Sequence, residues 1–384
     1  MLRWEQWPGR WRHLLCSIGL LCAAHSAYPA ATSLDVSEEK IVAVEQLLTE
    51  KMSAEGIPGL SIAIVLDGAL AWSRGYGMAD VENSVPATAT TAYRTASIGK
   101  ALTATAVMQL AEASKIELDA PIQRYCPSFP SKRWTVTTRH LLTHTSGIRH
   151  YGGAREEQEL FNTRHYGSVV EALHLFQEDP LQFEPGTQYQ YSTFGYNVLG
   201  CIVEGVTGGS FLDAMRRQIF DPAGMLDTRD DDPAAVIPRR AAGYVRTASG
   251  TLQNSRSVDM SSKLPAGGYI STVEDLARFA AALMNHELVR PETLEAMRTP
   301  TRLPQGEITG YGMGLGVMAA DDLWYGEREA FHGGGTPQVS GVLYMLPERR
   351  FAVILLMNLE ARPERVALAA QIAKQWLNLG GEQP

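Results

Sequence analysis

The segment Tyr93-Arg94-Thr95-Ala96-Ser97-Ile98-Gly99-Lys100 decides how the rest of the chain is interpreted. It opens a stretch in which apolar residues recur at helical spacing. Residues three apart on a helix share one face, with Cβ atoms about 5 to 6 Å apart, so Lys100 can reach Ser97. Desolvation at a buried helix start, together with the positive helix N-terminus, lowers a lysine pKa enough for it to take a serine proton. Alone, however, S-x-x-K also fits a capping serine followed by a surface lysine.

Two further motifs follow in order, Tyr191-Ser192-Thr193 before Phe194-Gly195-Tyr196, and His332-Gly333-Gly334-Gly335-Thr336 before a late strand. Supporting segments are Arg139-His140-Leu141-Leu142-Thr143-His144-Thr145-Ser146-Gly147 and Pro265-Ala266-Gly267-Gly268-Tyr269. On these motifs the sequence resembles the penicillin-recognising serine hydrolases. That family comprises class C β-lactamases, D-Ala-D-Ala carboxypeptidases, related esterases and the mitochondrial-type serine β-lactamase-like proteins. The last subgroup looks most similar, and the resemblance spans most of residues 40–378.

The resemblance implies a role for each matching position. Ser97 would attack the substrate carbonyl, and Lys100 and Tyr191 would share the proton that leaves Ser97 and returns to the departing group. Backbone N–H groups of Ser97 and Gly335 would form the oxyanion hole. Thr193, His332, Gly333 and Gly334 would contact the substrate. No metal and no cofactor is implied.

Two departures from the family motifs bear on the substrate. The second motif usually ends in Asn, and Thr193 is shorter and cannot donate to a substrate amide in the same way. In the third motif, Gly333 replaces a hydroxyl residue that would hold a substrate carboxylate, while His332 can be cationic near neutral pH. The sequence therefore predicts a small-molecule or peptide substrate, and favours esters over penicillins. A non-hydrolytic penicillin-binding or scaffold protein is the alternative.

The ends of the chain hold the predicted strands and the middle is helical. We expect a helix over Ser37 to Glu55, strands at Leu60 to Leu66 and Leu70 to Gly75, and late strands at Tyr311 to Met318, Val339 to Leu346 and Phe351 to Asn358 before a closing helix, Arg362 to Leu377. This order predicts an α/β (α+β) protein of the beta-lactamase/transpeptidase-like fold, an antiparallel sheet flanked by helices with an inserted helical domain. The sheet domain would be discontinuous, residues 35–119 and 266–380, and the insert residues 120–265.

Composition excludes other classes. The 384 residues are 45% hydrophobic and carry 34 Lys+Arg against 42 Asp+Glu, a formal net charge of -8. A globular core is therefore available, and the clustered basic surface of a nucleic-acid partner is missing. Oligomeric state is not visible in the sequence.

The N-terminus predicts a leader. Arginines precede an apolar run, Leu14 to Ala24, and the small residues Ala24-His25-Ser26-Ala27, so residues 1–27 are expected to be a signal peptide and the mature protein secreted or periplasmic. A lipoprotein anchored at Cys22 and an organelle transit peptide are the alternatives. The apolar run is shorter than the roughly 20 residues of a membrane-spanning helix, so no transmembrane segment is expected.

Cysteines and histidines complete the candidate residues. Cys126 and Cys201 are the cysteines that remain after removal of the leader. They can form one disulfide or stay as two buried free thiols, and the sequence favours the free thiols. His140 and His144 have the i, i+4 spacing of metal ligands, but no third ligand is evident and structural roles are favoured. Tyr189 and Tyr196 rival Tyr191 as the phenol near Ser97, and are interpreted as packing aromatics.

Overall fold

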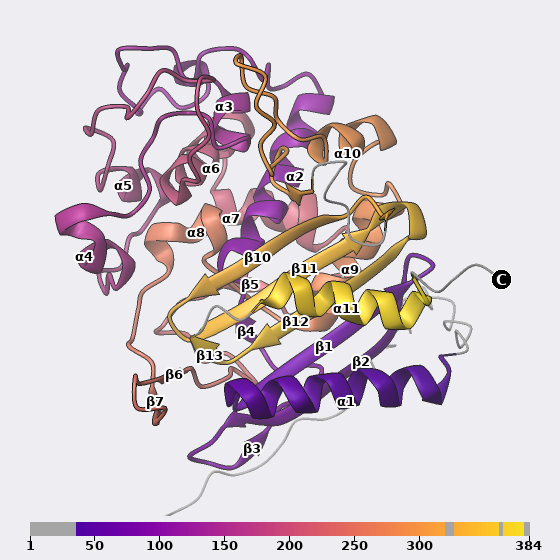
Figure 1. Ribbon diagram of the computed structural model, residues 1–384. Helices are drawn as coiled ribbons and strands as arrows, with labels where there is room; N and C mark the ends of the chain where they lie inside the picture. The colour runs from indigo at the N-terminus through magenta and orange to yellow at the C-terminus, as the bar shows by residue number, and fades with distance from the viewer. Residues whose placement is uncertain (1–35, 319–325, 361–363, 380–384) are drawn as a thin grey trace, which may run out of the picture. The chain divides into compact units, whose positions relative to one another are not determined.

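The computed structural model describes residues 36–318, 326–360 and 364–379 (Figure 1). Its main element is a seven-stranded sheet in the order β3-β2-β1-β12-β11-β10-β9, with neighbouring strands antiparallel. The first three strands and the last four lie far apart in the sequence. The strands are β1 (Gly59–Leu66), β2 (Ala69–Asp80), β3 (Val85–Pro86), β9 (Gly316–Val317), β10 (Ala330–Thr336), β11 (Val339–Leu346) and β12 (Phe351–Met357).

Both faces of the sheet are covered, and this explains the nearly continuous apolar sequence of β1. Successive side chains of a strand point to opposite faces. Ile62 and Ile64 belong to the core formed with α1 (Glu38–Glu55) and α11 (Arg365–Leu377). Ala63 and Val65 belong to the core on the other face, with α9 (Val273–Met284). Figure 1 shows α1 and α11 side by side on one face of the sheet.

Local sequence signals agree with the first elements. Helix α1 begins after Ser37, whose side chain accepts a hydrogen bond from the backbone of Lys40, and ends at Gly56 in the left-handed conformation. The turn between β1 and β2 has positive φ at both central residues, 52° at Asp67 and 75° at Gly68. An Asp-Gly pair tolerates these angles, which match the twist of the strands. The predicted helix-strand-strand beginning is confirmed.

The middle of the chain is mainly short helices and loops. Two of the chain's longer helices carry motif residues: α2 (Gly99–Glu112), which follows the 3-10 turn η1 (Ala96–Ile98) and precedes this middle region, and α6 (Thr193–Thr207), which lies within it. The predicted fold class is confirmed, whereas the division at residues 120 and 265 stays a prediction. The remaining helical elements are η2 (Ile122–Arg124), α3 (Thr138–Leu142), η3 (Gly153–Arg155), α4 (Glu156–Leu160), α5 (Val169–Leu173), α7 (Phe211–Met215), η4 (Arg216–Phe220), η5 (Ser261–Lys263), α8 (Leu264–Gly267), α10 (Pro291–Met297) and η8 (Pro347–Arg349).

Six short strands form two small sheets beside the main one. The order is β13-β6-β7 in one and β4-β8-β5 in the other. The second sheet matters for the site, because β4 leads directly into the turn that carries Ser97. These strands are β4 (Tyr93–Arg94), β5 (Arg229–Asp230), β6 (Tyr244–Arg246), β7 (Leu252–Asn254), β8 (Tyr269–Ser271) and β13 (Leu359–Glu360).

The late strands differ in part from the prediction. The strand expected over Tyr311 to Met318 is reduced to β9, because Gly314 adopts φ 92° and turns the chain just before it. The glycine-rich third motif, expected to precede a strand, is itself the strand β10. It pairs with β11 from Ala330 opposite Met345 to Thr336 opposite Val339. Backbone hydrogen bonding to β11 therefore outweighs the weak strand propensity of three glycines.

The preference for two free thiols is wrong. Cys126 and Cys201 form a disulfide, with their Cα atoms 5.4 Å apart. The bond joins the loop after η2 to α6, the helix that follows the second motif. Sequence alone could not decide this, since the two cysteines are 75 residues apart and only the tertiary packing brings them together.

The sequence also predicts a signal peptide and no transmembrane segment. The predicted signal peptide, residues 1–27, lies outside the described residues. Within the described residues no single helix combines the length and apolar character needed to cross a bilayer. One helix pair, Thr193–Thr207 with Phe211–Phe220, meets those two criteria jointly, with a bend of 79° between its members.

Candidate active site

Ser97 lies in a tight, strained turn between β4 and α2. It is the central residue of η1, and Ala96 before it adopts φ 46°, a conformation that side chains other than glycine rarely take. Two glycines allow this close approach. A Cβ atom on Gly267 would lie 1.7 Å from the Ala96 carbonyl oxygen, and one on Gly334 would lie 2.4 Å from the Thr95 carbonyl oxygen. The strained turn is therefore held between α8 and β10.

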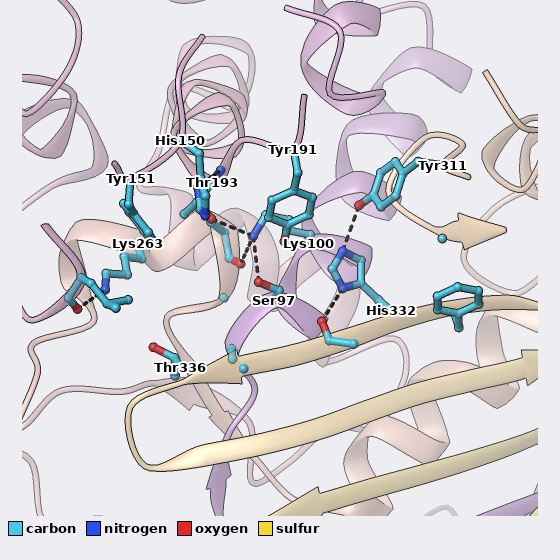
Figure 2. Close-up of a pocket in the computed structure, with 18 of the residues that line it drawn as sticks. Ser97, Lys100, His150, Tyr151, Tyr191, Thr193, Lys263, Tyr311, His332 and Thr336 are labelled. Carbon is cyan, nitrogen blue, oxygen red and sulfur yellow. Dashed lines mark hydrogen bonds between the residues drawn. The ribbon is translucent and has the colours of Figure 1, made fainter. Parts of the chain in front are cut away.

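The amine of Lys100 faces Ser97. Lys100 is completely buried, and its Nζ lies 3.1 Å from Ser97 Oγ. The same nitrogen donates to the Ala266 carbonyl oxygen at 3.1 Å and contacts Thr193 Oγ1 at 3.3 Å. Figure 2 shows these three contacts converging on one nitrogen. The helical spacing of Ser97 and Lys100 thus gives the proximity that the sequence predicts.

Burial lowers the pKa of Lys100 well below its usual value, and the positive charge of nearby Lys263 lowers it further. Desolvation is the dominant cause of this shift, so the helix N-terminus expected from the sequence is not its main source. No carboxylate pairs with Lys100 among the described residues. A neutral amine at this position has two N–H donors and one lone pair.

Tyr191 and Thr193 lie on the other side of Lys100. The ring centroid of Tyr191 is 4.9 Å from Lys100 Nζ, and Tyr191 shares the wall of one cavity with Ser97. Burial raises the pKa of Tyr191, so the phenol keeps its proton at neutral pH. Thr193 makes the contact to Lys100 that a longer asparagine makes in the family motif. The second motif and the Ser-Lys pair are therefore brought together as expected.

Two histidines position the second motif. His144 Nδ1 accepts a hydrogen bond from the Ser192 backbone N–H at 3.1 Å, and His150 Nδ1 accepts one from the Thr193 N–H at 3.2 Å. The His144 ring also packs against Tyr191, with centroids 4.3 Å apart. These contacts use free N–H groups of the first turn of α6. Nothing in the sequence indicates that these two histidines bind the backbone of the second motif, apart from their place in the segments that support the family resemblance.

His332 is neutral, which corrects the expectation of a cation. It is buried, and this burial is the main cause that lowers its pKa to about 3. Its Nδ1 donates to the Gly333 carbonyl oxygen at 2.8 Å. Since the other nitrogen of a neutral imidazole is an acceptor, Nε2 accepts from the Tyr311 hydroxyl at 2.9 Å. His332 therefore presents no charge to a substrate carboxylate.

Ser97 opens onto a cavity of about 620 Å³, which most of the predicted residues line (Figure 2). Gly334 is not among its lining residues and instead packs against the serine turn. Sequence reasoning missed the charged residues of this cavity. The predicted residues on its wall are Ser97, Lys100, Tyr191, Thr193, His332, Gly333 and Gly335, and the missed charged ones are Glu156, Lys263 and Arg365.

The remaining candidates have structural surroundings. His140 closes a capping box with Thr137 at the start of α3. Tyr196 is buried and donates to the Leu142 carbonyl oxygen at 3.0 Å, whereas Tyr189 is half exposed on the cavity wall. No group of three or more His, Cys, Asp or Glu residues within the described part of the chain is arranged to hold a metal ion.

Comparison with known proteins agrees with this geometry. The family model described as Beta-lactamase matches residues 44–375. The chain belongs to the beta-lactamase family. The human serine beta-lactamase-like protein LACTB, mitochondrial, is 34% identical, over 76% of this chain and 69% of the human protein. The putative penicillin-binding protein PbpX of Bacillus subtilis (strain 168) is 30% identical, over 77% of this chain and 72% of its own.

A solved beta-lactamase-family relative shares the fold over most of the chain. The octameric penicillin-binding protein homologue from Pyrococcus abyssi has a TM-score of 0.75 at 27% identity, over 88% of this chain and 77% of its own. The family is one of serine hydrolases. Within this family, Thr193 stands where the second motif usually has Asn, and Gly333 stands where the third motif usually has a hydroxyl residue. A Cβ atom on Gly333 would lie 3.1 Å from Arg365 Nε, so a guanidinium occupies the space beside the missing side chain.

Proposed function

We propose that this protein hydrolyses ester, amide or peptide substrates, β-lactams included, through an acyl-enzyme on Ser97. The supporting observation is the set of contacts made by the Lys100 nitrogen. Ala266 offers only a carbonyl acceptor, so one N–H points to it, and the second N–H points to Thr193 Oγ1. The lone pair of a neutral amine then faces the Ser97 hydroxyl. This is the arrangement that a general base requires.

The proton path follows from these positions. Lys100 takes the Ser97 proton as Oγ forms a bond to the substrate carbonyl carbon. Backbone N–H groups of Ser97 and Gly335 stabilise the oxyanion, each contributing about 3 to 4 kcal/mol. The Tyr191 phenol, protonated at neutral pH, gives its proton to the leaving atom, and the Lys100 ammonium then returns the proton taken from Ser97 to Tyr191. Water then releases the acyl group by the reverse path.

Substrate contacts are assigned to the rest of the cavity wall. Thr193, His332 and Gly333 face the substrate, and Gly334 supports the serine turn against which it packs. Because His332 is neutral and Gly333 has no hydroxyl, this wall lacks the donors that the family motif supplies for a carboxylate in the leaving group, and the Arg365 guanidinium is the cation that lies beside Gly333. Esters with an uncharged leaving group need no such donor and are the first substrates to test.

We also propose export to an oxidising compartment, followed by removal of residues 1–27. The disulfide between Cys126 and Cys201 supports this location, since such bonds persist outside the cytosol. Organelle targeting is the competing location, because the human relative is named as mitochondrial. The N-terminal sequence and cellular fraction of the native protein distinguish the two. A reduced protein that keeps residues 1–27 contradicts export.

The experiment is intact-mass analysis of the purified protein after incubation with p-nitrophenyl butyrate and, separately, with a penicillin. We expect a covalent adduct on Ser97 and release of p-nitrophenol. Ser97→Ala abolishes both, while the exposed control Ser249→Ala keeps them. Product without any Ser97 adduct under rapid quenching contradicts the acyl-enzyme. A permanent penicillin adduct without ester turnover identifies a non-hydrolytic penicillin-binding protein instead.

A further inference from the structure

A second buried lysine lines the cavity that holds Ser97. Lys263 is the last residue of η5 and directly precedes α8, the helix whose Ala266 carbonyl accepts from Lys100. Its relative exposure is 4%, and its side chain belongs to the cavity wall. One short segment therefore both positions the proposed base and brings a second amine to the substrate cavity. The proposed mechanism assigns no task to this amine.

The Lys263 ammonium has few partners for a buried charge. Nζ donates to the Leu160 carbonyl oxygen at 2.7 Å and lies 5.0 Å from the ring centroid of Tyr151. Across the described ranges no carboxylate forms an ion pair with it, and nearby Glu159 is bonded to Arg149 at 2.6 Å. An ammonium has three donors, and burying it without an anion is costly. A bound anion would supply the missing partner.

The position of Lys263 indicates which part of the substrate it meets. The leaving group lies toward Tyr191, the proposed proton donor, whose ring centroid is 6.4 Å from that of His332. Figure 2 shows Lys263 and His332 on opposite sides of Ser97. The portion of the substrate that stays on Ser97 as the acyl group therefore extends toward Lys263.

We infer that Lys263 selects substrates whose acyl portion carries a carboxylate. The substrate class is an ester or amide of a dicarboxylic acid, or a peptide with an acidic side chain next to the scissile bond. The Lys263 ammonium donates a hydrogen bond to that carboxylate, and Ser97 attacks the other carbonyl. This inference rests on the proposed acyl-enzyme function. The one carboxylate on the cavity wall, Glu156, is exposed at its rim.

The selection depends on pH. Burial and the charge of Arg94 lower the pKa of Lys263 to about 7, while Glu159 acts in the opposite direction. Facing Lys263 are also Lys100, neutral in the mechanism, and the Tyr151 phenol, whose pKa is raised by burial. Lys263 is thus protonated below about pH 7 and loses its charge above it, whereas the substrate carboxylate is ionised throughout. Preference for the anionic substrate falls as pH rises.

The test compares p-nitrophenyl butyrate with the mono-p-nitrophenyl esters of succinate and glutarate, with the rate of the Ser97→Ala protein subtracted. We expect kcat/KM at pH 6 to favour an anionic ester by at least about tenfold, and the preference to shrink at pH 8. Lys263→Gln removes the preference and Lys263→Arg retains it at both pH values. Lys132→Gln is the matched control, because Lys132 also donates to a backbone carbonyl beside an aromatic ring, away from the cavity.

Binding of free glutarate, followed by calorimetry, gives a readout that needs neither turnover nor a folded variant. We expect it to weaken from pH 6 to pH 8 in the wild-type protein. Butyrate turnover with no preference for the anionic esters, or glutarate binding that does not change with pH, overturns the role of Lys263 and leaves the proposed function standing. Glutarate binding without any ester turnover or Ser97 adduct overturns the proposed function instead.

Discussion

Replacing Lys100 by Met tests whether the lysine is neutral in the folded protein. Its folded pKa is depressed by burial, while in the unfolded chain it is about 10.4. Between these two values the unfolded state binds one more proton than the folded state, so the wild-type free energy of unfolding rises with pH. The contribution of one such group is about 1.4 kcal/mol per pH unit. Lys100→Met has no group to titrate and lacks this contribution.

The assay is urea unfolding of both proteins at pH 7, 8 and 9. We expect the wild type to gain about 1.4 kcal/mol per pH unit relative to Lys100→Met within the window above the folded pKa. Every other titrating group is shared, so it cancels in the difference. Exposed Lys115→Met is the control and should follow the wild type. Parallel curves for wild type and Lys100→Met would refute a neutral Lys100, and with it the general base.

Three other predictions concern the supports of the site. Tyr191→Phe should lower the acylation rate by about 10²- to 10⁴-fold, measured by stopped-flow, because a proton donor is lost, and an unchanged rate contradicts its role. Cys126→Ser with Cys201→Ser should lower the free energy of unfolding by about 4 kcal/mol, measured in urea, since the bond closes a long loop. Gly334→Ala should abolish turnover, because its Cβ would lie 2.4 Å from the Thr95 carbonyl oxygen. Gly333→Ala should retain most of the turnover, because its Cβ would lie 3.1 Å from the flexible Arg365 guanidinium. Equal losses of turnover in the two variants refute the packing argument.

Much of the fold is predictable from local signals. A capping serine and a glycine bound the first helix, and Asp67-Gly68 gives the hairpin turn. The strand β10 was missed because its three glycines have no side chains whose alternation could mark a strand. Only pairing with β11 identifies it as a strand.

The candidate active site is likewise predictable only in part from the sequence. The reach of Lys100 to Ser97 follows from helix geometry, and the order of the three motifs selects the family. The charge states could not be predicted reliably, because they depend on burial and on neighbours far along the chain. The sequence allows His332 to be cationic near neutral pH, whereas its burial in the folded protein lowers its pKa to about 3 and leaves it neutral. Nothing in the local sequence of Lys263 marks this residue as facing the cavity, and only the fold places it on the cavity wall.

The sequence by itself determined the chemistry available to this protein: a serine and a lysine one helical turn apart, a tyrosine motif and a glycine-rich segment in a fixed order. Only the tertiary structure decided how those groups act. It buries Lys100 with its Nζ within hydrogen-bond distance of the Ala266 carbonyl oxygen, Thr193 Oγ1 and Ser97 Oγ, and it brings Lys263 into the same cavity. The physical reason is that helix spacing, caps and tight turns depend on residues close together in the sequence, whereas desolvation and electrostatic coupling arise from residues that meet only when the chain is folded.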